Sequence, residues 1–137
     1  MKVIRKRIYG IPYGQIKPRG DKSACENWSS EVRSQTIKLP KVKGPCVLRV
    51  IFILPGDHCP TDHPYGNDLD NLLKRFCDAL QKTVLANAPG RDGAIVRIEA
   101  EKILSSRNNL PGAKLEVLCL NSSPNPSLQR TPLLRRR

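Results

Sequence analysis

The stretch CVLRVIFIL, residues 46–54, constrains the fold more than any other part of the chain. Every residue in it except Arg49 is apolar, several are β-branched, and Pro45 and Pro55 stand directly before and after it. A short apolar run with such boundaries is typical of a β-strand in the centre of a sheet. The rest of the chain must therefore supply its neighbouring strands.

Three further segments have strand character. Residues 2–9 alternate loosely between polar and apolar side chains, and residues 94–104 and 114–120 are apolar-rich runs joined by a turn-rich connection. Because side chains alternate along a strand, residues 94–104 are expected to present two faces: one with Ile95, Arg97, Glu99 and Glu101, the other with Val96, Ile98, Ala100 and Lys102.

Two segments have helical spacing. Residues 21–38 begin at an Asp or Ser that can cap a helix. Trp28, the only Trp, lies on the apolar stripe of this segment, so we expect it in the core rather than stacked on a nucleic-acid base. Residues 70–84 carry the clearest apolar helical face of the chain, which consists of Leu73, Phe76, Cys77, Leu80 and Val84.

The order strand, helix, strand, helix, strand, strand predicts one α+β domain over residues 1–120. Residues 121–137 are rich in Ser, Pro and Asn and end in three Arg, so they are predicted to be a disordered basic tail. The chain has no run of about 18 apolar residues, and no apolar stretch follows its basic N-terminus. Neither a membrane span nor a secretory signal is therefore expected.

The charge of the chain favours polyanionic partners. There are 24 Lys and Arg against 12 Asp and Glu, a net charge of +12. Nucleic acid is the leading candidate, because each neutralised phosphate releases counterions; simple solubility, or binding to an acidic protein or membrane surface, is the alternative. Lys17 and Arg19 lie in a loop rich in Pro and Gly and are candidate phosphate contacts, or else part of a solvated basic surface.

The five cysteines show no C-x-x-C spacing, which argues against a disulfide framework and a four-Cys zinc site. Cys46, Cys77 and Cys119 fall in apolar runs and are expected to be small buried hydrophobes in a reducing compartment. We therefore expect a cytoplasmic protein. One proline-stiffened loop contains residue types that bind zinc but lacks a second ligand pair; they are His58, Cys59 and His63.

The segment GNDLDNLLKRFCDALQ, residues 66–81, places Asp68 and Asp70 one residue apart where a helical pattern begins. Side chains at i and i+2 converge in an extended chain but not in a helix, so these carboxylates converge only if the segment before the helix is extended. Converging carboxylates repel unless a cation lies between them. Mg²⁺ takes one or two carboxylates together with waters and phosphate oxygens, and in a basic surround this combination suits hydrolysis of a nucleic-acid phosphodiester.

Lys74 lies one helical turn after Asp70 and is placed to stabilise charge on a phosphate. The alternative is a capped helix with ordinary ion pairs between residues i and i+4. Asp92 is the next acid along the chain and a candidate third metal ligand. Its rivals are Asp57, Asp62 and Asp78.

The motif DLDNLLKRFCDAL resembles the central motif of the RusA family of Holliday-junction resolvases, D-x-D-N-L-x-K-x-x-x-D-A-L. The segment RDGAIVRIEAEK resembles the family's D-D-x-x-V strand start, which is followed by a Lys about ten residues on. Arg91 stands where the first Asp of that pair is usual. The resemblance covers about residues 3–120, and the matching residues are Asp68, Asp70, Asn71, Leu72, Lys74, Asp78, Ala79, Leu80, Asp92 and Lys102.

The resemblance implies a small α+β homodimer, a two-layer mixed β-sheet with two helices, of a kind often encoded by prophages. It implies an endonuclease that cuts four-way DNA junctions by paired nicks and depends on Mg²⁺, with Mn²⁺ as a substitute. Two scissile phosphates related by symmetry need two sites, which suits a two-fold dimer. The metal-binding acids would be Asp68, Asp70 and Asp92, with Lys74 as the catalytic lysine.

The resulting hypothesis is a metal-dependent endonuclease that binds branched DNA, with no membrane and no small-molecule cofactor as partners. The DNA contacts would come from Lys17, Arg19, Lys74 and Lys102. The alternative is a non-catalytic nucleic-acid-binding protein, or an inactive relic of the resolvase, in which the acids only cap a helix.

Overall fold

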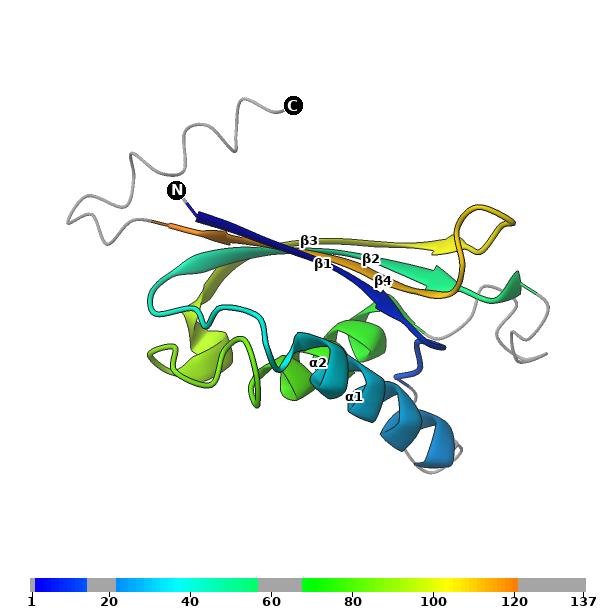
Figure 1. Cartoon of the computed structure of the whole chain (residues 1–137), viewed down its shortest axis with the longest axis horizontal. Coiled ribbons are helices and arrows are strands. Elements are labelled where there is room, and N and C mark those ends of the chain that lie inside the picture. The colour runs from blue at the N-terminus through cyan, green and yellow to red at the C-terminus, as the bar shows by residue number, and fades with distance from the viewer. Residues whose placement is uncertain (1, 15–21, 57–67, 121–137) are drawn as a thin grey trace.

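A computed structural model describes residues 2–14, 22–56 and 68–120 of the chain (Figure 1). Within these ranges, four strands form one sheet in the order β1-β4-β2-β3. Residues 46–54 have a strand on each side, as predicted, and the α+β fold with a mixed sheet and two helices is confirmed. The elements are β1 (Lys2–Tyr9), α1 (Lys22–Thr36), β2 (Cys46–Leu54), α2 (Leu69–Leu80), the short 3₁₀ helix η2 (Arg91–Ala94), β3 (Ile95–Leu104) and β4 (Gly112–Cys119).

The sheet is mixed: β2 pairs parallel with β3 and antiparallel with β4, and β4 pairs antiparallel with β1. Parallel neighbours cannot be joined by a hairpin, so α2 carries the chain from the end of β2 back to the start of β3. Both helices lie on the same face of the sheet, and both begin at the end where β1 and β2 finish (Figure 1). No helix in the described ranges is long and apolar enough to cross a membrane.

Three aromatic side chains join the two helices to the sheet. Trp28 of α1 stacks on Phe76 of α2 with ring centroids 6.3 Å apart, and Phe52 of β2 meets Phe76 edge-on at 5.4 Å. All three side chains are buried, so Trp28 belongs to the core as predicted. Offset-stacked and edge-to-face contacts are the favoured geometries of aromatic pairs, and here they fix α1 and α2 against the central strand.

The second helix ends at Leu80, before its predicted end at residue 84. The chain then turns, and the N–H of Leu85 donates to the carbonyl oxygen of Leu80 at 2.9 Å. Val84 is nevertheless fully buried. It therefore serves the core from a turn, a position that apolar spacing alone does not distinguish from another turn of helix.

The predicted alternation along β3 holds from Arg97 onward but not at Ile95. A register shift between Cys46 and Val47 places Ile95 opposite Cys46 and Arg97 opposite Val47. Ile95 consequently packs against the core instead of sharing the face of Arg97. An irregularity of this kind adds one residue to one strand and re-aims the side chains before it.

We predict that Phe76→Ala lowers the free energy of unfolding by about 3–5 kcal/mol, because it removes a buried ring and leaves a cavity between both helices and β2. Urea denaturation followed by circular dichroism measures the change. Ile37→Ala is the control, since Ile37 is 51% exposed and its truncation should change stability by less than about 0.5 kcal/mol. Equal losses in the two variants would contradict the packing described.

Candidate functional site

The predicted acid pair lies at the N-terminus of α2. Asp68 directly precedes the helix and has extended backbone, with φ −60° and ψ 141°, whereas Asp70 is already in the first helical turn. Both side chains are exposed. The extended geometry that lets residues i and i+2 converge is therefore present at Asp68 only.

The two carboxylates have different local roles. Asp68 makes no side-chain hydrogen bond that caps the helix. Asp70 Oδ1 accepts a hydrogen bond from the backbone N–H of Asn71 at 2.9 Å and so satisfies one of the free donors of the first turn. The capping alternative applies to Asp70, while the Asp68 carboxylate has no hydrogen-bond partner among the described residues.

The segment that follows β1 packs directly on this helix start. A Cβ atom at Gly14 would lie 2.5 Å from the carbonyl carbon and oxygen of Asn71 and 2.6 Å from the backbone nitrogen of Leu72. Only glycine leaves room for so close an approach of two backbones. Gly14 therefore holds the chain against the turn that carries Asp70.

We predict that Gly14→Ala destabilises the protein by about 1–3 kcal/mol, because the added methyl group forces the chain away from the first turn of α2. Thermal unfolding measures the loss. Gly44→Ala is the matched control, since a Cβ at Gly44 meets nothing within 4 Å. A Gly14→Ala protein as stable as Gly44→Ala would show that the close approach does not exist in solution.

Two of the predicted basic residues lie at this end of the sheet. Lys74 is exposed on α2, one turn after Asp70, and within the described part of the chain it forms no ion pair with Asp70 or Asp78. Lys102 lies near the carboxyl end of β3, opposite Phe52 and therefore on the face that the helices cover. Lys74 thus lies one helical turn from Asp70, and Lys102 lies on the helix-covered face of the sheet.

Asp92 lies near the C-terminal end of α2, away from Asp68 and Asp70. Its Oδ2 accepts a hydrogen bond from Nε2 of Gln81 at 3.0 Å, and the same nitrogen lies 3.4 Å from Oδ1 of Asp78. Gln81 is the C-cap of α2, about 16 Å along the helix axis from Asp70. The structure therefore brings Asp92 together with Asp78 and does not bring it to the Asp68 and Asp70 pair.

Two exposed carboxylates at a helix start fit the donor set of Mg²⁺, which takes one or two carboxylates and completes its octahedron with waters and phosphate oxygens. A third ligand from Asp92 does not fit within one chain, because of its place at the other end of α2. In the residues that the structure describes, no three His, Cys, Asp or Glu side chains form a group suited to a metal ion. Within the described residues, Asp68 and Asp70 are therefore the candidate acidic ligands at the start of α2.

Several predicted features lie outside the described residues. They are Lys17 and Arg19 of the basic loop, the acids Asp57 and Asp62, the zinc candidates His58, Cys59 and His63, and the tail 121–137.

The cysteines behave as the sequence predicts at two of the three positions. Burial raises the pKa of the Cys46 thiol to about 11 and that of the Cys77 thiol to about 12. Cys119 is half-buried, and burial raises its pKa as well. Thiols with such pKa values stay protonated at neutral pH and are poor nucleophiles, which argues against cysteine catalysis at these positions.

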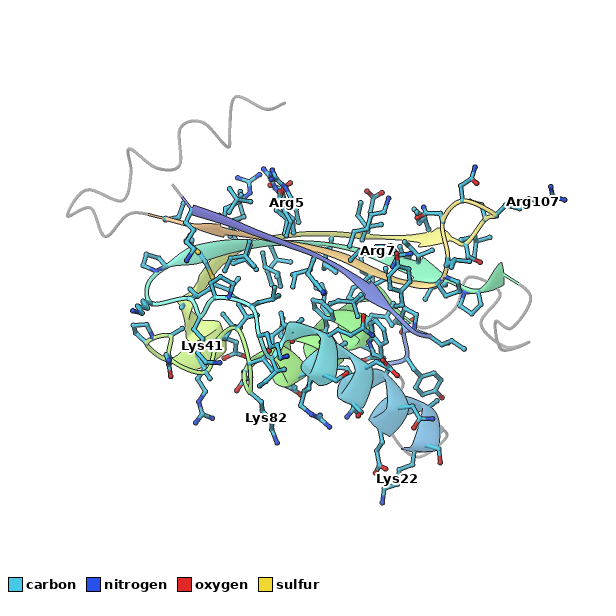
Figure 2. The ribbon with its side chains drawn as sticks, in the orientation of Figure 1. Arg5, Arg7, Lys22, Lys41, Lys82 and Arg107 are labelled. Atoms are coloured by element: carbon cyan, nitrogen blue, oxygen red, sulfur yellow. The ribbon has the colours of Figure 1, made fainter. Side chains whose placement is uncertain are left out.

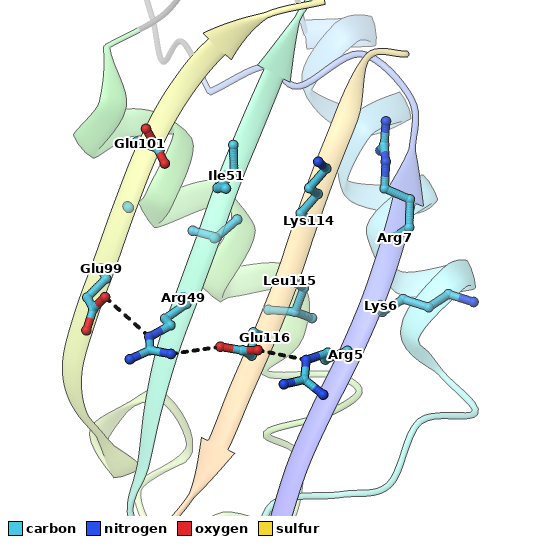
Figure 3. A pocket seen from close by; sticks show the side chains of 12 residues that line it. Arg5, Lys6, Arg7, Arg49, Ile51, Glu99, Glu101, Lys114, Leu115 and Glu116 are labelled. Atoms are coloured by element: carbon cyan, nitrogen blue, oxygen red, sulfur yellow. Dashed lines mark hydrogen bonds and ion pairs between the residues drawn. The ribbon is translucent and has the colours of Figure 1, made fainter. Parts of the chain in front are cut away.

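A row of ion pairs that was not predicted from the sequence lies on the face of the sheet opposite the helices (Figure 3). Arg5 Nε lies 2.8 Å from Glu116 Oε2, and Arg49 Nη1 lies 3.0 Å from Glu116 Oε1. Arg49 Nε lies 3.2 Å from Glu99 Oε1 without hydrogen-bond alignment, and Arg97 Nε lies 3.3 Å from Glu99 Oε2. The row borders a hollow of about 720 Å³.

The Glu116 carboxylate accepts hydrogen bonds from two arginines, Arg5 and Arg49. The hydrogen bond from Arg49 holds the pKa of its carboxyl below the usual 4.5, and the hydrogen bond from Arg5 adds to this effect against the opposing effect of burial. A lowered folded-state pKa means that the stabilisation is complete above pH 4.5 and is lost as the pH falls through the lower folded value. The ion pairs thus contribute stability at neutral pH and none in strong acid.

We predict that Glu116→Gln lowers the free energy of unfolding at pH 7 by about 1–2 kcal/mol, because Arg5 and Arg49 lose the carboxylate that they share. The difference from wild type should shrink as the pH falls below 4.5. Urea denaturation at a series of pH values measures both effects. A difference that stays constant down to pH 2 would contradict the linkage.

Comparison with models of known protein families gave no match, and a search of curated proteins gave none either.

Proposed function

We propose that the protein is a Mg²⁺-dependent endonuclease of the resolvase type that binds branched DNA and hydrolyses its phosphodiester bonds at the start of α2. One observation carries the proposal: Asp68 and Asp70 stand exposed at the helix start, and the Asp68 carboxylate is not used as a cap. The match of DLDNLLKRFCDAL to the resolvase motif and the net charge of +12 support it.

The residues of the site have separate tasks in this proposal. Asp68 and Asp70 hold Mg²⁺, which when bound polarises a phosphorus–oxygen bond and lowers the pKa of water. Lys74, exposed one turn away, stabilises negative charge that develops on the phosphate. Lys102 lies at the same end of the sheet and, with Lys17 and Arg19, contacts the DNA backbone.

Positive charge is distributed over both sides of the molecule. Figure 2 shows Arg5 and Arg7 on one face of the sheet and Lys22, Lys41 and Lys82 on the side of the helices. A four-way junction presents phosphates in several directions, so such a distribution suits recognition by shape, which backbone contacts provide without a direct sequence code. The proposal includes a homodimer and a cytoplasmic location.

The decisive experiment incubates the full chain with a synthetic four-way DNA junction, with and without Mg²⁺. We predict metal-dependent nicks that Asp70→Asn reduces by about 10²-fold or more, because charge stabilisation at the metal is lost. Asp78→Asn is the matched control, since Asp78 is exposed on the same helix two turns away. Cleavage that Asp70→Asn leaves unchanged would overturn the proposal.

Asp92→Asn provides a separate test within the same assay. If one chain supplies only Asp68 and Asp70 to the metal, Asp92→Asn should keep cleavage within about threefold of wild type, since its carboxylate is hydrogen-bonded to Gln81 at the other end of α2. A loss as large as that of Asp70→Asn would show that Asp92 reaches the metal in the active assembly.

The second candidate function is a non-catalytic nucleic-acid-binding protein. The separation of Asp92 from Asp68 and Asp70 favours it, because the described residues do not form a three-acid site. This function predicts junction binding that weakens steeply with salt and no cleavage in Mg²⁺ or Mn²⁺.

A further inference from the structure

Arg7 and Tyr9 form a stacked pair at the end of β1, on the face of the sheet opposite the helices. Because side chains alternate along a strand, both residues point to this face. The guanidinium carbon of Arg7 lies 4.4 Å from the centroid of the Tyr9 ring, within the range of a cation–π contact. Tyr9 is nevertheless 52% exposed, whereas the three aromatic side chains of the core are buried. The pair therefore presents an aromatic surface to solvent at the edge of the sheet.

The guanidinium of Arg7 is held in place by the backbone around it. Its Nη1 donates a hydrogen bond to the carbonyl oxygen of Ile8 at 2.6 Å, and its Nη2 donates one to the carbonyl oxygen of Leu110. Gly112 lies opposite Tyr9 on β4. A Cβ atom at Gly112 would overlap the carbonyl oxygen of Ile8 and lie 2.6 Å from Arg7 Nη1, so only glycine leaves room for the guanidinium there.

The backbone of Tyr9 is fixed by α1. Its N–H donates to Gln35 Oε1 at 2.9 Å, and its carbonyl oxygen accepts from Gln35 Nε2 at 2.7 Å. The same Nε2 donates to Glu31 Oε1 at 2.7 Å, so the carboxylate of Glu31 lies on the helix side of β1. A ring carried by so constrained a backbone needs little ordering when it binds a ligand, which favours affinity.

Positive charge surrounds the pair at the β1 edge of this face. Lys114 lies opposite Arg7 on β4 (Figure 3); it is exposed, and none of the described acids forms an ion pair with it. Arg107 is exposed in the connection between β3 and β4 (Figure 2). Glu101, the acid in the same row, lies on β3, three strand spacings or about 14 Å from Arg7. Glu116 is neutralised by its two arginines. This edge therefore favours a negatively charged ligand.

Two exposed apolar residues come from the segments that border the pair. Ile11 and Leu110 are 55% and 57% exposed. A hydrogen bond from the N–H of Gly10 to the carbonyl oxygen of Pro111, at 3.3 Å, joins the two segments. Exposed apolar residues that gather in one place indicate a binding surface. With the aromatic ring and the cations, they suit a ligand that has a flat apolar face and carries negative charge.

We propose that Arg7 and Tyr9 form a platform on which an unpaired nucleic-acid base stacks, while Lys114 and Arg107 bind the phosphates of its strand. Every base has a π face that can stack on an aromatic ring, and neighbouring cations attract the backbone. Bases inside a duplex are stacked on one another and do not offer that face. The platform therefore selects DNA with unstacked bases, such as those at a branch point.

The inference rests on the part of the proposed function that concerns branched DNA, and not on cleavage. Gly14 comes five residues after Tyr9 and packs on the first turn of α2, which carries Asp70. The Cα atoms of Tyr9 and Gly14 are therefore at most about 18 Å apart, a distance of about five nucleotide steps of 3.4 Å along a duplex strand. A base held on the platform would place phosphates a few nucleotides away near Asp68 and Asp70.

Binding measured without divalent metal separates the platform from cleavage. The full chain is titrated into a DNA duplex with one bulged 2-aminopurine, a fluorescent analogue of adenine, and into a duplex in which the analogue is paired. We expect wild type to quench the bulged base by stacking and to bind that duplex about tenfold or more tightly than the paired one. Tyr9→Ala should abolish both the quenching and the preference, and Tyr9→Phe should keep both.

Ile37→Ala is the matched control, because Ile37 is an equally exposed apolar residue just after α1; it should bind and quench like wild type. Lys114→Gln should weaken binding to both duplexes alike and reduce the slope of log K against log salt by about one, with the quenching unchanged. Circular dichroism melting establishes that each variant folds. If Tyr9→Ala does not fold, Tyr9→Leu replaces it, since leucine keeps the apolar bulk without a π face.

The outcomes distinguish the platform from the nuclease. A Tyr9→Ala protein that still quenches and prefers the bulged duplex would overturn the platform even if wild type cleaves junctions. A salt slope that Lys114→Gln leaves unchanged would overturn the phosphate contact. Wild type that binds neither duplex would overturn the platform and the proposed DNA binding together. Quenching that depends on Tyr9, in a protein that never cleaves in Mg²⁺, would support the platform and overturn only the nuclease.

Discussion

β2 and β3 run parallel and adjacent, and the chain must cross the helix face of the sheet between them. α2 is that crossover, so its start lies where β2 ends and the residues after it lie where β3 begins. This constraint separates Asp68 and Asp70 from Asp92 more firmly than any local contact does. The hydrogen bond from Gln81 to Asp92 is a consequence of this separation and not its cause. A change of side-chain rotamer could not bring all three carboxylates of one chain to a single ion, because the path of the chain holds them at opposite ends of α2.

The same topology places the starts of both helices at the opposite end of the sheet from Asp92. Both α1 and α2 begin beside the carboxyl ends of β1 and β2, so the positive ends of two helix dipoles lie together there. Gly14 packs on the first turn of α2, and Lys102 approaches from β3. Backbone dipoles at this end of the helices favour negative charge.

The sequence predicted the bounds of an element well where a Gly or Pro residue stands at its end. β1 and β2 have the predicted bounds, since Gly10 follows the first and prolines flank the second. The start of α2 was predicted within one residue, but its end was not, because apolar spacing does not distinguish the turn that carries Val84 from another turn of helix. The order of the strands is non-local. No periodicity states that β4 inserts between β1 and β2, so the meeting of Arg5, Glu116 and Arg49 could not be predicted from their positions along the chain.

Glu116 also affects the register in which β4 pairs with its neighbouring strands. Because side chains alternate with a period of two, a slip of β4 by one residue would turn Glu116 toward the apolar layer under α2 and leave Arg5 and Arg49 without their acid. The misaligned sheet would bury a charge, which costs far more than the ion pairs gain. The carboxylate thus penalises pairings of β4 that are shifted by one residue from the native register.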